Sequence, residues 1–266
     1  MKNQIEINWI RIKKAILQKN KNLTSDEVEE VFAKFRAIHH MLGEYSLGRT
    51  TVTALCSHML RHKGVIKCLV PVCPDYSHEN GLYTLNNVSG GISMIAQKHI
   101  DFLKGIHEHI QIEAHFLYAD YETEDVYLRN KVDITKEDFV ERIHQSKEVC
   151  TSIVSNMGWT ASLMTDHIPD IQEKESVHIE LIRSEEKYKR KIEYDTINKN
   201  DLFNRINPDF TWDDKILRTL KYSAQYYVMG LFCLEKDYVV CNHTTANLSW
   251  YVQLGAGILH NPVAIY

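Results

Sequence analysis

Two apolar segments of this chain end in residues that can do chemistry. The first segment, KCLVPVCPDY, ends in Cys73, Asp75 and Tyr76. The second, IEAHFLYADYETED, ends in an acidic run that includes Asp120 and Glu122. A cysteine thiolate is a good acyl acceptor once a base, a cation or a helix N-terminus lowers its pKa. The carboxylates could bind an amine, a ribose or a divalent cation.

Each of these groups also has a purely structural explanation. Cys73 could fill a buried strand as a small apolar residue, like Cys68 five positions earlier. The acidic run could be a solvated loop. His58 and His62 stand one helical turn apart, but their surroundings lack the remaining ligands of a zinc site. The sequence therefore predicts no metal and no cofactor.

A glycine-rich turn precedes the helix between the two segments. The connection from Tyr76 to Ser93 is long, and it closes with Gly90, Gly91 and Ser93. Small residues at a helix N-terminus let backbone N–H groups approach a phosphate or carboxylate. The same residues equally suit a glycine turn followed by a serine cap.

The elements that position these groups are two strands joined by a crossover helix. Such a unit belongs to a parallel sheet, and ligands bind at the carboxyl ends of its strands. Apolar runs alternate with helical patterns along the chain, which predicts an α/β fold. We expect a Rossmann-like open, mainly parallel sheet with helices on both faces. The predicted strands lie near 67–73, 113–120, 160–165 and 238–241.

The helices follow from caps and apolar periodicity. Thr24 or Ser25 should cap one helix and Thr135 another, because acidic residues follow in the first turn. The expected helices cover 4–20, 25–40, 50–61, 135–156, 170–195 and the apolar stretch KILRTLKYSAQYYVMGLFCL, with an irregular connection over 198–214. Without repeats or a Pro/Gly-rich linker, 1–266 should be one domain. An N-terminal helical segment over 1–65 would precede the Rossmann-like core of 66–266.

Composition excludes some classes of protein. The 266 residues are 44% hydrophobic and 25% charged, which is typical of a globular protein. Lys+Arg 31 against Asp+Glu 35 gives a net charge of −4, so no global positive field favours nucleic acid. The N-terminus is not a secretory signal, and no run approaches the roughly 20 apolar residues of a spanning helix. We expect a cytoplasmic protein without a membrane partner, whose six cysteines are thiols.

One local run is basic despite the acidic total. Residues 183–191 hold five basic and two acidic side chains. On a single helix, Arg183, Lys187, Arg190 and Lys191 would share a face that suits the phosphate backbone of RNA. A solvated helix without a partner would have the same composition.

Taken in order, these features resemble the cyclodipeptide synthases, whose domain is similar to the catalytic domain of class I aminoacyl-tRNA synthetases. The resemblance covers roughly residues 66–252. Pro71–Cys73 stand where the family has its G-x-S nucleophile motif, and YADYETED matches an acidic turn. WTASLMT and the basic run match the segment that contacts tRNA. Tyr222 to Tyr226 match the Tyr-x-x-x-Glu of a late helix, and CNHTTANLSWY matches an aromatic loop.

The resemblance implies a transferase that uses aminoacyl-tRNA and forms peptide bonds through an aminoacyl-enzyme. Cys73, in place of the family's serine, would carry the aminoacyl group as a thioester. Tyr222 would position the amine, and Tyr226 replaces the family's glutamate in the catalytic set. The expected substrate-binding residues are Asp75, Tyr76, Gly90, Gly91, Ser93, Asp120, Glu122, Asn242 and Tyr251, the last of which would line the pocket.

Two alternatives belong to other classes. The C-terminal stretch DYVVCNHTTANLSWYVQLGAGILHNPVAIY resembles the donor-binding end of fucosyltransferase-like glycosyltransferases. Asn242, Thr244, Thr245 and Asn247 would then contact the diphosphate of a nucleotide sugar. The third possibility is an α/β module that binds a small molecule without catalysis. The sequence leaves the oligomeric state open.

Overall fold

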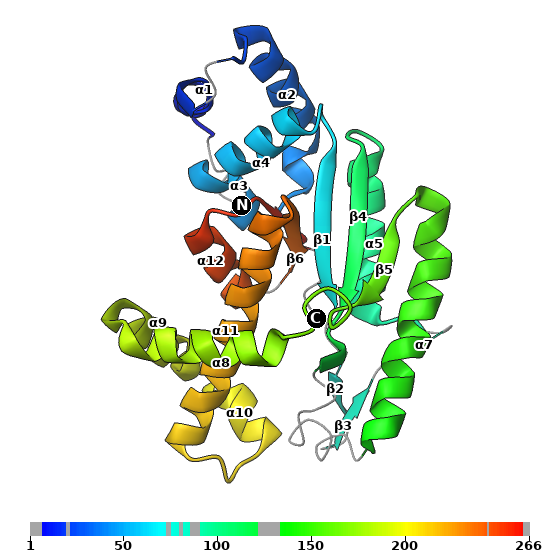
Figure 1. Ribbon diagram of the computed structural model, residues 1–266, viewed down its shortest axis with the longest axis vertical. Coiled ribbons are helices and arrows are strands. Elements are labelled where there is room, and N and C mark those ends of the chain that lie inside the picture. Colours follow the sequence, from blue (N-terminus) through cyan, green and yellow to red (C-terminus); the bar gives the residue numbers. More distant parts are fainter. Residues whose placement is uncertain are drawn as a thin grey trace.

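A five-stranded parallel sheet forms the centre of the protein (Figure 1). The computed structural model describes residues 7–19, 22–72, 76–79, 82–85, 91–121, 134–243 and 245–262. The strands of the sheet are β1 (Ile66–Val72), β4 (Ile112–Tyr118), β5 (Thr160–Leu163), β6 (Val239–Asn242) and β7 (Ile258–His260). This is the Rossmann-like open α/β fold that the sequence predicts, and the four predicted strands are confirmed.

The order of the strands determines where a ligand can bind. They lie in the order β5-β4-β1-β6-β7, so the chain leaves β1 first toward one edge and later returns to the other side. The direction in which the chain adds strands to the sheet therefore reverses between β1 and β6. In open parallel sheets, ligands bind outside the carboxyl ends of the strands at such a reversal.

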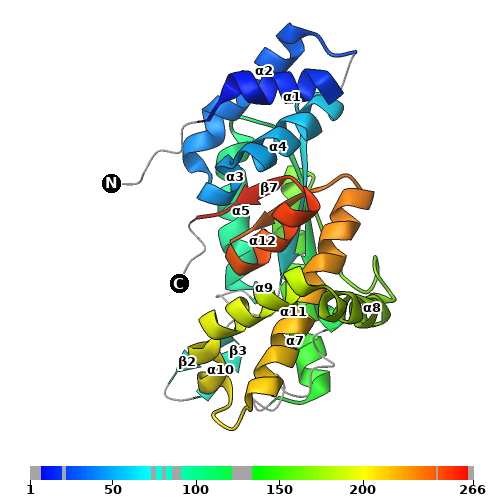
Figure 2. The same cartoon turned by 90° about the vertical axis from the view of Figure 1, so that its left-hand side faces the viewer.

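Helices cover both faces of the sheet, as the sequence predicts. They are α1 (Trp9–Lys19), α2 (Ser25–Ile38), α3 (Glu44–Leu47), α4 (Arg49–Arg61), α5 (Met94–His107), α7 (Lys136–Val154), α8 (Ile171–Ser184), α9 (Glu186–Asn198), α10 (Asn200–Ile206), α11 (Trp212–Glu235) and α12 (Thr245–Leu254), with short 3-10 turns at His39–Met41 and Ser155–Met157. Figure 2 shows α1 and α2 at one end of the molecule, and α9 and α10 toward the other.

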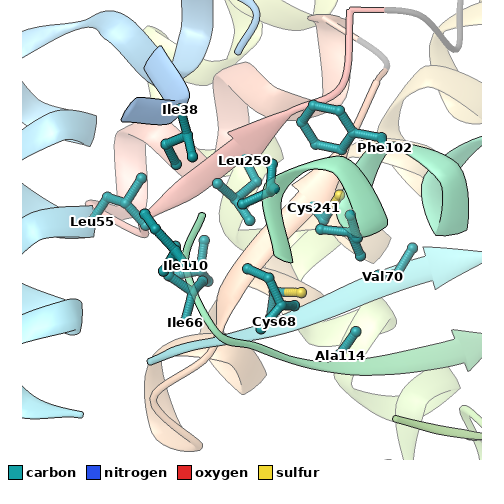
Figure 3. Close-up of a cluster of buried hydrophobic side chains, with 14 of the residues drawn as sticks. Ile38, Leu55, Ile66, Cys68, Val70, Phe102, Ile110, Ala114, Cys241 and Leu259 are labelled. Carbon is teal, nitrogen blue, oxygen red and sulfur yellow. The ribbon is translucent and has the colours of Figure 1, made fainter. Parts of the chain in front are cut away.

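Side chains of β1 alternate between two hydrophobic clusters, because successive residues of a strand point to opposite faces. Cys68 and Val70 belong to the larger cluster, together with residues of α2, α4, α5 and α7. Leu69 belongs to the second cluster, with residues of α11 and α12. Figure 3 shows part of the larger cluster, in which Cys68, Val70 and Cys241 lie among side chains of the helices.

The predicted helix caps are confirmed. Thr24 caps α2 in a capping box with Glu27, and Thr135 caps α7 by accepting a hydrogen bond from the Asp138 N–H. Each cap satisfies backbone donors that the first helical turn leaves without partners.

One prediction about local structure is confirmed with a correction, and another is wrong. Residues 170–195 are helical, as predicted, but the extended backbone at Glu185 divides them into α8 and α9. Residues 198–214 are not an irregular connection, since they hold α10 and the start of α11. A capping box between Thr211 and Asp214 begins α11 at Trp212.

A hairpin lies within the long connection after β1. Its strands β2 (Tyr76–Glu79) and β3 (Leu82–Leu85) are antiparallel, and Glu79 pairs with Leu82. The two residues between the strands are Asn80 and Gly81, the strongest short sequence signal for a two-residue hairpin turn. The signal was present in the sequence, but the sequence prediction treated the segment as a loop.

We expect Phe116→Ala to destabilise the fold strongly. Phe116 of β4 is fully buried in the larger cluster, and such a truncation removes apolar burial and leaves a cavity. The free energy of unfolding in urea should fall by about 3–5 kcal/mol. Glu113→Ala on the same strand, where the side chain is 52% exposed, is the control and should change it by less than about 0.5 kcal/mol. Equal losses in the two variants would contradict this packing.

Candidate functional site at the carboxyl edge

Several predicted site residues lie outside the described residues: Cys73, Asp75, Gly90, Glu122 and Thr244. Tyr76 begins β2, Thr245 begins α12, and Asn247 lies within α12, but the structure describes only their backbone. The predicted residues whose side chains it does describe fall into three groups, at the ends of strands, on α11 and α12, and on α8 and α9.

Asp120 joins the carboxyl ends of two neighbouring strands. It follows β4, and its carboxylate accepts hydrogen bonds from the Thr165 N–H at 3.1 Å and from the Thr165 hydroxyl beyond β5. A cavity of about 560 Å³ opens beside this pair, and its wall includes Tyr121, Asp170 and Glu173. Asp120 therefore orders the sheet edge next to a cavity lined largely by acidic and polar groups.

The glycine turn before α5 is used structurally. Gly91 has a φ of 82°, a left-handed conformation that favours glycine. Ser93 caps α5 by accepting from the Ala96 N–H at 3.3 Å, and its own N–H donates to Ser146 Oγ at 2.8 Å. Both interactions engage groups that an anion at this helix start would need, so the structure favours the turn and cap over an anion site.

The predicted tyrosines of α11 lie on one side of that helix. Tyr222 and Tyr226 are four residues apart, and Arg218 precedes them by another four, so the three share a face. Arg218 donates to the Tyr222 hydroxyl at 3.4 Å, and the Tyr226 ring meets that of Tyr251 edge-on at 6.2 Å. Tyr251 is fully buried. The structure thus brings Tyr226 and Tyr251 together from different helices.

Two cationic side chains lie beside Tyr222, one from α11 and one from the junction of α9 and α10. The ammonium of Lys199 lies 5.7 Å from the centre of the Tyr222 ring, and Arg218 lies 5.9 Å from it. Burial lowers the pKa of Lys199. Lys215 is buried and donates to the amide oxygens of Asn200 and Asn204 at 2.8 and 2.6 Å. The ring of Tyr222 therefore lies close to two cationic side chains, Lys199 and Arg218, which the sequence did not predict.

The four predicted RNA-binding residues do not share one helix face. Arg183 belongs to α8 and the other three to α9. Lys191 is paired with Asp195 at 2.8 Å and lies over the Trp250 ring, so it contributes to the packing of α9 against α12. Lys187 and Arg190 remain exposed and lie near Glu185 and Glu186 at 2.8 and 3.7 Å.

Buried polar groups collect where β6 and β7 end. Asn242 ends β6, His243 follows it, and Asn261 follows β7. His99 of α5 contacts both His243 and Asn261. The His99 ring is 3.3 Å from that of His243 between nitrogens, and Asn261 donates to His99 at 3.2 Å. Of these four, the sequence prediction included only Asn242. The polar pairs that follow two apolar strands were a signal, but a lone histidine inside α5 gave none.

Ser162 of β5 lies between two histidines on the other half of the sheet. Its hydroxyl is 2.6 Å from Nε2 of His115 and 2.8 Å from Nε2 of His167. Burial lowers the pKa of His115 to about 4, so this imidazole is neutral near pH 7. These bonds tie β4 to β5 and to the turn after it.

Three possible metal ligands meet at the opposite, amino edge of the sheet: His58, His62 and Asp237. Arg61 donates to both oxygens of Asp237 at 3.0 and 2.6 Å, and His62 Nε2 lies 2.9 Å from it. Nε2 of His58 accepts the Lys67 N–H at 3.0 Å, so its Nδ1 carries the proton and faces Asp237. A guanidinium and a protonated nitrogen occupy the ligand positions, which fits an ion-paired cluster better than a metal site.

We expect Asp237→Asn to cost about 1 kcal/mol of unfolding free energy at pH 7, because the pair with Arg61 is partly exposed. Asn keeps the left-handed backbone that Asp237 adopts at φ 54°. Arg61 holds the pKa of Asp237 well below its ordinary value. Ionised Asp237 therefore stabilises the folded state at any pH above about 4, the pKa of an aspartate in the unfolded chain. This contribution is lost as the pH falls below that value.

Urea unfolding of the wild type and of Asp237→Asn from pH 7 to pH 2 measures the difference in their free energies of unfolding. This difference should shrink at the acidic end. Zinc provides the second readout, since an ion-paired cluster predicts an unchanged melting temperature in both proteins. A melting temperature that rises with zinc only in the wild type would contradict the ion-paired cluster.

Comparisons with known proteins do not identify the chain. No protein-family model matches the sequence, and no curated protein matches it. None of the helices in the described parts of the chain has the length and apolarity needed to span a bilayer. The function must therefore be inferred from the carboxyl edge of the sheet and from the residues around it.

Proposed function

We propose that this chain is an acyl-transferring enzyme that uses aminoacyl-tRNA, with its reaction centre at the carboxyl edge between β1 and β6. The order of the strands is the observation that carries this proposal, because the direction of the chain reverses between these two strands. β1 leads into Cys73 along the chain, and β6 leads into His243. Leu69 pairs with Val240, and three residues further along each parallel strand come Val72 and His243.

The proposed reaction needs one nucleophile and no cofactor. The Cys73 thiol attacks the ester carbonyl of the aminoacyl group, the ester C–O bond breaks, and the proton that the thiol loses passes to the terminal oxygen of the tRNA, which leaves as a hydroxyl. The neutral amine of a second aminoacyl group then attacks the thioester, the C–S bond breaks as the peptide bond forms, and the proton that the amine loses restores the Cys73 thiol. Tyr222 would orient that amine, and the positive environment of Lys199 and Arg218 would favour its neutral, nucleophilic form.

The remaining cysteines give this proposal a clean test. Cys56, Cys68, Cys150, Cys233 and Cys241 are all free and buried. Burial raises the pKa of Cys56 to about 12 and that of Cys150 to about 11. The same cause raises the pKa of the other three thiols. Rapid alkylation of native protein by iodoacetamide would therefore report on Cys73.

We expect Cys73 to be acylated by charged tRNA. Intact-mass analysis after incubation should show one added aminoacyl group on the wild type and none on Cys73→Ala, which should form no product. Cys73→Ser should keep some activity, because a hydroxyl can form the corresponding ester. Cys68→Ala is the control, and it should still be acylated. Normal turnover by Cys73→Ala would contradict covalent catalysis here and would direct attention to nucleotide-sugar binding.

The basic residues of α9 would contact the tRNA. Lys187 and Arg190 are exposed, and their side chains are 67% and 81% accessible. Exposed ion pairs with glutamate are weak, so a phosphate can replace the glutamate as partner. We do not include Lys191 in this proposed interface, because its ammonium is paired with Asp195 and lies over the Trp250 ring.

We expect Lys187→Glu/Arg190→Glu to weaken tRNA binding and to reduce the slope of log affinity against log salt by about 2, because two phosphate contacts are lost. Arg11→Glu/Lys14→Glu on α1, far from α9 in Figure 2, makes the same change in charge and is the control. Fluorescence anisotropy with labelled tRNA across a salt series measures both. An identical salt slope in the two double variants would remove α9 from the interface.

A further inference from the structure

The buried polar groups at the ends of β6 and β7 form a directed chain of hydrogen bonds. Asn261 and His99 are fully buried, and His243 keeps 9% of its surface exposed. Asn261 N–H donates to the Asn242 carbonyl at 3.0 Å, and His243 N–H donates to Asn242 Oδ1 at 2.6 Å. The first bond joins the segment after β7 to the end of β6, and the second orders the Asn242 side chain against the main chain of His243.

The orientation of the Asn261 amide is determined by a backbone carbonyl. Its Nδ2 lies 3.2 Å from the carbonyl oxygen of Lys98 and 3.2 Å from Nδ1 of His99. A carbonyl can only accept, so the amide nitrogen and not the amide oxygen must occupy this position. Nδ1 of His99 therefore accepts a hydrogen bond, and the Cys241 thiol at 3.5 Å is a second possible donor to the same atom.

This fixes the tautomer of both imidazoles in turn. A neutral histidine whose Nδ1 accepts carries its proton on Nε2. Nε2 of His99 is 3.3 Å from Nδ1 of His243 and donates to it. His243 then carries its own proton on Nε2, which has no hydrogen-bond partner among the described residues.

Both rings are neutral near pH 7. Burial lowers the pKa of His99 to about 3, and the neighbouring His243 lowers it further. Burial also lowers the pKa of His243 to about 4, assisted by Lys98 and His260. A neutral imidazole N–H can stabilise negative charge on an oxygen without transferring its proton.

We propose that His243 offers this neutral Nε2–H to an oxygen of the ligand at the carboxyl edge, and that His99 and Asn261 are positioning residues that hold it in this tautomer. The choice of oxygen rests on the function proposed above: it is the carbonyl oxygen of the acyl group, which becomes an oxyanion when the nucleophile attacks. The hydrogen-bond chain itself depends only on described residues.

Two-bond ¹⁵N–¹H spectra of the labelled protein at pH 7 test the tautomers. His99 and His243 should both show a bare Nδ1 and a protonated Nε2. His58 provides an internal control of opposite sign, because its Nε2 accepts the Lys67 N–H and its proton must be on Nδ1. A protonated Nδ1 or a charged ring at His243 would overturn the proposal.

His99→Leu tests the positioning role separately. Loss of the donor to Nδ1 should leave His243 with signals averaged between its two tautomers. An unchanged His243 spectrum would overturn the role of His99. If this variant does not fold, the wild-type spectrum still tests the tautomer of His243, and the pair of variants at position 243 still tests its role as a donor.

A matched pair at position 243 tests ligand binding. His243→Gln keeps an N–H donor and should retain turnover within about tenfold, whereas His243→Met, of similar length, has none and should lose about 100-fold or more. Equal turnover in the two would overturn the donor role. A wild-type protein that never turns over charged tRNA would overturn the proposed function and this ligand oxygen, while the spectra would still decide the tautomers.

Discussion

Burial of β1 on both faces is the constraint on which the rest of the structure depends. β1 is hydrogen-bonded to β4 on one side and to β6 on the other, and its alternate side chains enter two different hydrophobic clusters. A strand in this position needs helices above and below it, because parallel strands are rarely stable with one face in water. The crossovers that supply these helices bring every carboxyl end to the same edge. Packing of the core and location of the site thus have a common cause.

The two edges of the sheet use polar residues differently. At the amino edge, Asp237 pairs with Arg61 and His62 in a cluster that joins α4 to the start of β6. At the carboxyl ends of β6 and β7, the buried groups are neutral and hydrogen-bonded in a defined direction from Asn261 to His243. Neutral groups suit this position, because burying an unpaired charge would cost several kcal/mol. Neutral and ordered donors at the ends of β6 and β7 can stabilise charge that arises only during a reaction.

Sequence patterns predicted the features that depend on residues close together in the chain. The strands followed from apolar runs, and the starts of α2 and α7 followed from Thr24 and Thr135, because caps act within one helical turn. The break at Glu185 escaped prediction, since both flanking segments have helical composition. His99 could not be identified because its partners Cys241, His243 and Asn261 lie more than 140 positions away in the chain. Periodicity carries no information about such distant contacts.

The short outer strands of the sheet have a consequence for how the protein behaves at high concentration. β5 has four residues and β7 has three, and these strands form the two borders of the sheet. A border strand exposes backbone donors and acceptors that can recruit a strand of a neighbouring molecule. Borders this short offer few such groups, while the long strands β1 and β4 are enclosed. The fold thus keeps its most aggregation-prone segments in the interior.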